Sequence, residues 1–267
     1  MKQRVISGIA GVILLIAVLT LGTPFVEIAV ALIAAMAAIE LSNATGISGD
    51  KRLKITIVAG TVFLVAAQFF DNTLFMPALY VYILAVFAVY MINMENVALK
   101  DVAITFFLTV YVAFMFGHLI LVRNMFDGHL LVWLVFIGAF VTDTAALFGG
   151  KFFGKHKLCP KLSPKKTIEG SIGGVIGCVA ATLIYCLICQ LGFGVSPHYG
   201  YAVIIAFGSS LVSQVGDLAA SCIKRQFGIK DYGKIMPGHG GVMDRFDSIL
   251  FVAPFVYYML IIFPIFG

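Results

Sequence analysis

Apolar segments long enough to cross a lipid bilayer recur along almost the whole chain. Each contains about 17 to 25 mostly apolar residues, and about 20 such residues span the hydrocarbon core as a helix. The composition agrees, because 61% of the 267 residues are hydrophobic and 12% are charged. Nine spans are predicted, at residues 5–22, 25–44, 54–70, 74–93, 102–122, 130–149, 168–191, 200–222 and 248–266.

These segments are expected to be helices. Backbone polar groups in lipid must find partners within their own segment, and the sequence lacks the alternation typical of membrane strands. The predicted fold class is therefore an all-α polytopic membrane protein with about nine transmembrane helices. Residues 1–122 would form N-terminal helices 1–5, and residues 123–267 would form helices 6–9 with two basic loops.

The basic residues predict the orientation. Of the 18 Lys and Arg residues, 17 fall on one side of the predicted membrane, and Arg123 falls on the other. Because cytoplasmic loops carry the excess of Lys and Arg, the N-terminus is expected inside and the C-terminus outside. Anionic lipid headgroups explain the net charge of +5, so we expect no nucleic-acid partner.

One lysine-rich loop precedes the seventh predicted span, within residues 151–174. One interpretation is a topology signal followed by a helix that begins near Thr167 or Ile168, with Ser163-Pro164 suited to a cap and first turn. The other makes Lys165, Lys166 and Thr167 an anion clamp at a helix N-terminus. Both remain open. The glycines that follow have the spacing of closely packed helices; they are Gly170, Gly173, Gly174 and Gly177.

The eighth predicted span carries a polar stripe along one helical face. Its members are Ser210, Ser213, Gln214, Asp217, Ser221 and Lys224. A stripe with a carboxylate inside a membrane span should face a wet cavity or the interior of the bundle. We interpret Asp217 as a metal ligand at the inner edge of the membrane; the alternative is a helix-packing stripe with one acid near the interface.

Two further acids lie within predicted spans, Glu40 and Asp143. Either could be a ligand or a structural partner of buried donors. The sequence leaves both alternatives open.

The segment Ser221–Asp247 is the densest charged region of the chain, with five basic residues and three aspartates. Its glycines allow the backbone to approach an anion closely. Asp244 and Asp247 are three residues apart and would share a face of a helix that begins there. Carboxylate oxygens suit Mg²⁺, which takes one or two of them and completes its shell with substrate phosphates.

A longer pattern in this segment resembles the CDP-diacylglycerol synthase (phosphatidate cytidylyltransferase) family. That family's motif reads S-x-hydrophobic-K-R, four residues, K-D, then P-x-H-G-G-hydrophobic-x-D-R-hydrophobic-D. The positions in register are Ser221, Lys224, Arg225, Lys230, Asp231, Pro237, His239, Gly240, Gly241, Asp244, Arg245 and Asp247. Met236 is a conservative departure, and Ser163–Thr167 upstream also resembles the family.

The resemblance implies an enzyme of phospholipid biosynthesis that converts CTP and phosphatidic acid into CDP-diacylglycerol and pyrophosphate with a divalent cation. It would lie in the cytoplasmic (plasma or inner) membrane, with its active site facing the cytosol. We expect Mg²⁺ at Asp217 and Asp244, with Asp247 supporting it or holding a second ion. The Asp217 assignment comes from the polar stripe, outside the family motif.

The remaining site predictions concern the substrates. Lys224 and Arg225 are expected to act in catalysis beside Asp217 and Asp244. The residues expected to bind phosphates or shape the nucleotide site are Lys165, Lys166, Thr167, Lys230, His239, Gly240, Gly241 and Arg245. Glycine-rich helix faces are compatible with a homodimer and equally with tight packing in one chain.

Two alternatives compete with this interpretation. A CTP-dependent polyprenol or phytol kinase would transfer the γ-phosphoryl group and release CDP. A secondary transporter would use Asp143 and Asp217 at the membrane midplane and would show internal repeats, which the sequence lacks.

Overall fold

A computed structural model of the chain describes residues 2–47, 50–233, 235 and 240–266, with side chains described from Gly8 onward. Within these residues, eight helices are long and apolar enough to cross a membrane, and Gly8–Leu21 is a shorter apolar helix. The nine predicted spans coincide with helices or runs of helices whose ends differ from the prediction by a few residues. The predicted polytopic helical fold is confirmed.

The chain divides into two compact units. The first comprises Met1–Leu121 and Phe227–Arg245, and the second comprises Val122–Gln226 and Phe246–Gly267. Each unit is thus built from segments distant in sequence. The last long helix, α10 (Met243–Ile262), begins in the first unit and continues in the second.

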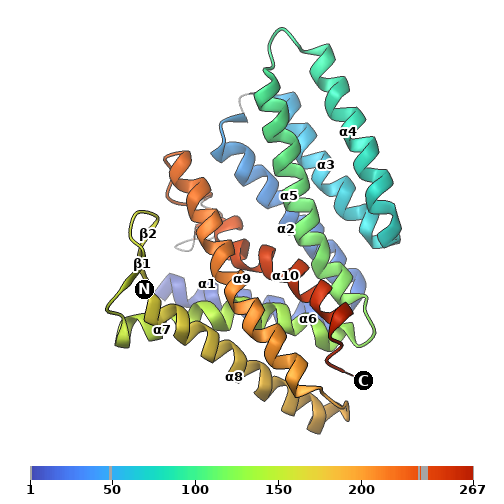
Figure 1. The fold of residues 1–267 in the computed structure, drawn as a ribbon. Coiled ribbons are helices and arrows are strands. Elements are labelled where there is room, and N and C mark those ends of the chain that lie inside the picture. The colour runs from blue at the N-terminus through green and yellow to red at the C-terminus, as the bar shows by residue number, and fades with distance from the viewer. Residues whose placement is uncertain (1, 48–49, 234, 236–239, 267) are drawn as a thin grey trace. The chain divides into compact units, whose positions relative to one another are not determined.

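The first unit is a helical bundle (Figure 1). Its elements are α1 (Lys2–Leu21), α2 (Thr23–Ala44), α3 (Lys51–Phe70), the 3-10 turn η2 (Asn72–Leu74), α4 (Phe75–Ile92) and α5 (Leu99–Arg123). Helix α3 packs against α2 and α4. The Tyr82 hydroxyl of α4 donates a 2.6 Å hydrogen bond to Thr109 of α5 in the buried interior. This bond gives two hydroxyl groups a partner, which lipid could not provide.

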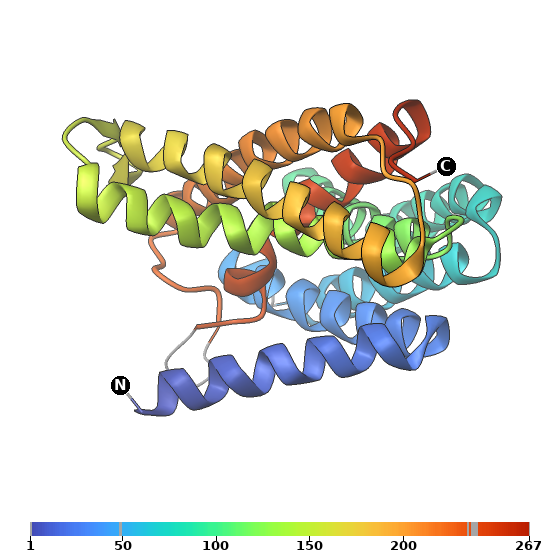
Figure 2. The same ribbon diagram turned by 90° about the horizontal axis from the view of Figure 1, so that it is seen from below.

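The second unit begins with a run of helix interrupted by one wider turn. Its elements are α6 (Gly128–Phe136), the π-helical turn η3 (Ile137–Val141), α7 (Thr142–Phe153), β1 (Lys157–Cys159), β2 (Ser163–Thr167), α8 (Ile168–Phe193) and α9 (Tyr199–Gln226). Figure 2 shows α7 and α8 running alongside each other, joined at one end by the β1–β2 hairpin.

The hairpin changes one expectation. Strands β1 and β2 pair antiparallel, with Lys157 opposite Thr167. Ser163 and Pro164 therefore lie in β2, and the expected cap at these two residues is wrong. The cap of α8 is Thr167, whose hydroxyl accepts a 3.1 Å hydrogen bond from the N–H of Gly170. Thr167 is preferred because extended backbone suits both the last residue of a strand and an N-cap.

Glycines allow α7 and α8 to pack so closely that their backbones are nearly in contact. A Cβ at Gly170 would lie 2.7 Å from the Ala146 carbonyl oxygen, and one at Gly174 would lie 3.1 Å from that of Thr142. A Cβ at Gly177 would lie 2.5 Å from the Ala145 Cβ. The predicted close packing through small residues is confirmed, and it fixes the hairpin that joins the two helices.

Gly170→Ala is expected to destabilise the protein by about 1–3 kcal/mol, because the new methyl group would overlap a backbone carbonyl that cannot move alone. Thermal unfolding in detergent measures this loss. Gly192→Ala is the matched control, since it lies in the same helix with no heavy atom within 4 Å of its Cβ position. Equal melting temperatures for the two variants would contradict the close packing.

Candidate active site

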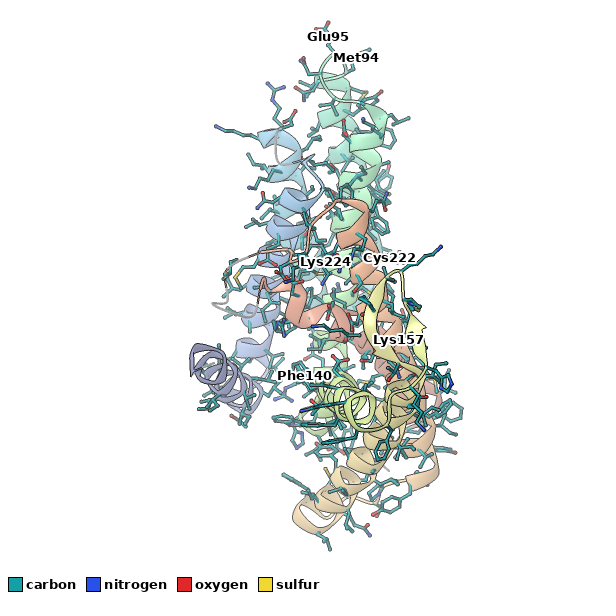
Figure 3. All side chains as sticks on the ribbon, turned by 90° about the vertical axis from the view of Figure 1, so that its left-hand side faces the viewer. Met94, Glu95, Phe140, Lys157, Cys222 and Lys224 are labelled. Carbon is teal, nitrogen blue, oxygen red and sulfur yellow. The ribbon has the colours of Figure 1, made fainter. Side chains whose placement is uncertain are left out.

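An ion pair joins the lysine-rich loop to the polar stripe. Lys166 Nζ, on β2, lies 2.6 Å from Asp217 Oδ2, on α9, and both side chains are half-buried. Figure 3 shows the hairpin beside α9, with Lys157 and Lys224 labelled on these two elements. Two features that the sequence presented separately are therefore parts of one site in the second unit.

Polar contacts between α8 and α9 lie one helical turn from Asp217. The Ser171 hydroxyl donates a 2.5 Å hydrogen bond to Gln214 Oε1. Ser210, Ser213 and Gln214 are buried, so this part of the stripe faces the protein interior, one of the two predicted alternatives, whereas Asp217, Ser221 and Lys224 are partly exposed. The Ser171–Gln214 bond holds the two helices together beside the Lys166–Asp217 ion pair.

Asp247 brings α10 into the same site. Its buried carboxylate lies within electrostatic range of Asp217, Lys224 and Asp143. The N–H of Ser248 donates to Asp247 Oδ1 at 2.8 Å, and the Ser248 hydroxyl donates to Asp143 Oδ2 at 3.2 Å. In the second unit, Asp143, Asp217 and Lys224 thus lie within electrostatic range of Asp247, and Lys166 is paired with Asp217.

The close approach of α9 and α10 depends on a small residue beside Asp217. A Cβ at Gly216 would lie 2.8 Å from the Asp247 carbonyl oxygen. A larger residue would separate the helices at the level of the two carboxylates.

The carboxylates of Asp217 and Asp247 are compatible with a hard cation whose remaining positions are filled by water or phosphate oxygens. Among the described residues, no group of three or more His, Cys, Asp or Glu side chains forms a ready metal site. Mg²⁺ does not require such a group, because it takes one or two carboxylates and leaves positions for water and phosphate oxygens. Asp217 and Asp247 supply that kind of donor set.

Asp244 is held by backbone donors in the first unit. Its Oδ2 accepts hydrogen bonds from the N–H groups of Tyr232 at 2.8 Å and Gly241 at 3.0 Å. The next two N–H groups, of Val242 and Met243, donate to Glu40 at 2.9 and 2.8 Å. Three successive N–H groups at the start of α10 therefore point at the chain's own carboxylates.

The other predicted site residues vary in their surroundings. Lys165, Arg225, Lys230 and Arg245 have exposed side chains, whereas Thr167 is buried as the cap of α8. Gly240 has a positive φ of 87°, which favours glycine. His239 lies outside the described residues. The substrate-binding roles of all these residues stay predictions.

Glu169 anchors the base of the hairpin. Its carboxylate accepts hydrogen bonds from the N–H groups of Lys155 at 3.1 Å and His156 at 3.2 Å. The His156 ring Nδ1 lies 2.6 Å from Glu169 Oε1. The first turn of α8 thus holds the strand that pairs with β2, which carries Lys166.

The sequence matches the cytidylyltransferase family over residues 2–263. It is 33% identical over 282 aligned residues to the phosphatidate cytidylyltransferase of Bacillus subtilis strain 168, covering 98% of both chains. It is 31% identical over 264 residues to the phosphatidate cytidylyltransferases of Staphylococcus saprophyticus and Staphylococcus aureus strain COL. Each of these alignments covers 98% of this chain and 99% of the relative.

Glu169→Ala is expected to loosen the hairpin, because two backbone donors and the His156 ring lose their shared acceptor. The amides of Lys155 and His156 should exchange with deuterium several-fold faster, as hydrogen-exchange mass spectrometry can measure. Glu95→Ala, in the exposed connection between α4 and α5, is the control. Unchanged exchange at the hairpin in Glu169→Ala would show that Glu169 does not anchor it.

Proposed function

Since the chain belongs to the cytidylyltransferase family, we propose that it transfers CMP from CTP to phosphatidic acid, forming CDP-diacylglycerol and pyrophosphate. Relatives named phosphatidate cytidylyltransferase align with it over nearly their whole length. A polytopic membrane protein also suits a substrate that resides in the bilayer. The observation that carries the proposal is the cluster of Asp217, Asp247, Lys166 and Lys224, which offers both signs of charge to phosphates and a cation.

The reaction requires no side-chain nucleophile. A phosphate oxygen of phosphatidic acid attacks the α-phosphorus of CTP. The bond from that phosphorus to the oxygen bridging to the β-phosphate breaks, and pyrophosphate leaves. The difficulty is bringing two polyanions together and stabilising charge on the leaving group, which positioning and cationic groups accomplish.

Mg²⁺ is the proposed cofactor. Asp217 and Asp247 of the second unit are the proposed ligands of one ion, and Asp244 of the first unit is proposed to bind a cation together with substrate phosphates. When bound, Mg²⁺ would neutralise phosphate charge and orient the triphosphate. Asp244 has the backbone hydrogen bonds expected of a metal-binding carboxylate, because ligating carboxylates are usually held by neighbouring donors. Asp244 and Asp247 are three residues apart in α10.

The cationic side chains would bind the phosphates. Lys166 and Lys224 lie beside the carboxylates of the second unit, and binding of a triphosphate would give each lysine a second anionic partner. The exposed cations Lys165, Arg225, Lys230 and Arg245 are proposed to attract CTP and the lipid headgroup to this face. The hydroxyl of Thr167 accepts a hydrogen bond from Gly170 as the cap of α8, and its own proton is proposed to be donated to a phosphate.

The site is proposed to face the cytosol from the plasma membrane. The two basic loops that flank α8 and α9 carry most of the Lys and Arg residues, as cytoplasmic loops do. This orientation would let cytosolic CTP meet a lipid of the inner leaflet at the interface.

The first prediction separates the transferase from a CTP-dependent lipid kinase. With CTP carrying a radioactive α-phosphate, the purified protein should transfer the label to phosphatidic acid in mixed micelles, detected by thin-layer chromatography. A kinase would leave that label in CDP and phosphorylate the lipid from the γ-position. Lipid labelled from γ-labelled CTP alone would overturn the proposed reaction.

Asp217→Asn is expected to reduce CDP-diacylglycerol formation on the order of 100-fold or more, because it removes charge that the proposed cation requires. Asp244→Asn should have an effect of similar size. Asp127→Asn is the matched control: Asp127 lies in a connection at a positive φ of 54°, which Asn tolerates well. A folded Asp217→Asn or Asp244→Asn variant with a near-normal rate would remove that residue from the site.

A further inference from the structure

We propose that Glu40 is a positioning residue that fixes the start of α10 and, through it, the carboxylate of Asp244. Glu40 lies near the end of α2, about 200 residues before its partners, and the residue is 3% exposed. The inference rests on the proposed function, in which Asp244 binds the cation. It assigns a role to a membrane acid that lies outside the sequence motif.

Both oxygens of Glu40 bind backbone of the first unit. Oε1 accepts from the N–H of Val242 at 2.9 Å, and Oε2 accepts from the N–H of Met243 at 2.8 Å. These groups belong to the start of α10, where backbone N–H groups have no partner within the helix. A buried carboxylate suits them, because the bonds are charge-assisted and the helix dipole favours an anion there.

The surrounding chain is shaped to the Glu40 carboxylate. A Cβ placed on Gly233 or on Gly241 would overlap the carboxylate group of Glu40. The φ of Gly241 is not positive, so its backbone conformation does not require glycine. The contact with Glu40 instead explains why this position has no side chain. The glycines let backbone close around Glu40 from two sides.

Glu40 and Asp244 accept hydrogen bonds from adjacent backbone N–H groups just before α10. The N–H of Gly241 donates to Asp244, and the next N–H, of Val242, donates to Glu40. A shift of Val242 would therefore move the donor that orients Asp244. Partners one shell away from a metal typically change metal affinity or activity about 10- to 100-fold when removed.

Glu40→Gln tests the proposal with nearly the same side-chain volume. The glutamine side chain has one carbonyl oxygen, which can accept from one of the two N–H groups, and one NH₂ group, which cannot accept from the other. One of the two hydrogen bonds to Val242 and Met243 is therefore lost. We expect the Mg²⁺ concentration for half-maximal CDP-diacylglycerol formation to rise about 10-fold or more, with a smaller change in the KM for phosphatidic acid. Glu27→Gln, the same change in the same helix, should match the wild type.

The outcomes distinguish this inference from the proposed function. Wild-type protein that forms no CDP-diacylglycerol would overturn the function itself. Active wild type with an unchanged Mg²⁺ requirement in Glu40→Gln would overturn the role of Glu40. A fall in melting temperature without any change in the Mg²⁺ dependence would likewise reduce Glu40 to a structural residue.

A second pair of variants tests the contact without an activity assay. Gly241→Ala should lower the melting temperature, because its methyl group overlaps the carboxylate of Glu40. Glu40→Asp shortens that side chain and makes room, so adding it to Gly241→Ala should recover part of the loss. Strictly additive losses in the double variant would show that the two residues do not share this contact.

Discussion

The arrangement of this protein depends on the cost of placing a carboxylate near lipid. A charged group in the membrane is stable only with an opposite charge or hydrogen-bond donors beside it. Asp217 has Lys166, and Asp143 accepts from Ser248. Glu40 and Asp244 take the backbone donors at the start of α10. Each carboxylate therefore fixes a contact between two elements: the hairpin with α9, α7 with α10, and α2 with the start of α10.

The partners are of two kinds. Glu40 and Asp244 bind backbone N–H groups, which cannot leave without unwinding the start of α10. Asp217, in contrast, is paired with Lys166, a long side chain on the hairpin. Within the first unit the carboxylates are thus held by backbone, whereas in the second unit Asp217 is held by a side chain.

Glycines let the elements that carry these contacts pack closely enough to form them. Gly170, Gly174 and Gly177 bring α7 and α8 to backbone distance, which sets the position of the hairpin. Gly216 does the same for α9 and α10 beside Asp217, and Gly241 does so for the backbone around Glu40. In lipid, where helices gain little from hydrophobic burial, such close packing and polar contacts supply the specificity of association.

The sequence by itself determined the helical spans, because the hydrocarbon thickness sets the length of an apolar segment and lipid excludes an unsatisfied backbone. The polar face of α9 also followed from periodicity alone. Local pattern misassigned Ser163 and Pro164, because strand pairing with β1 overrode their preference for a helix start. The sequence could not pair Lys166 with Asp217 or Glu40 with Val242, since such contacts depend on how distant segments pack. Only the tertiary structure decided which partner each of these carboxylates found.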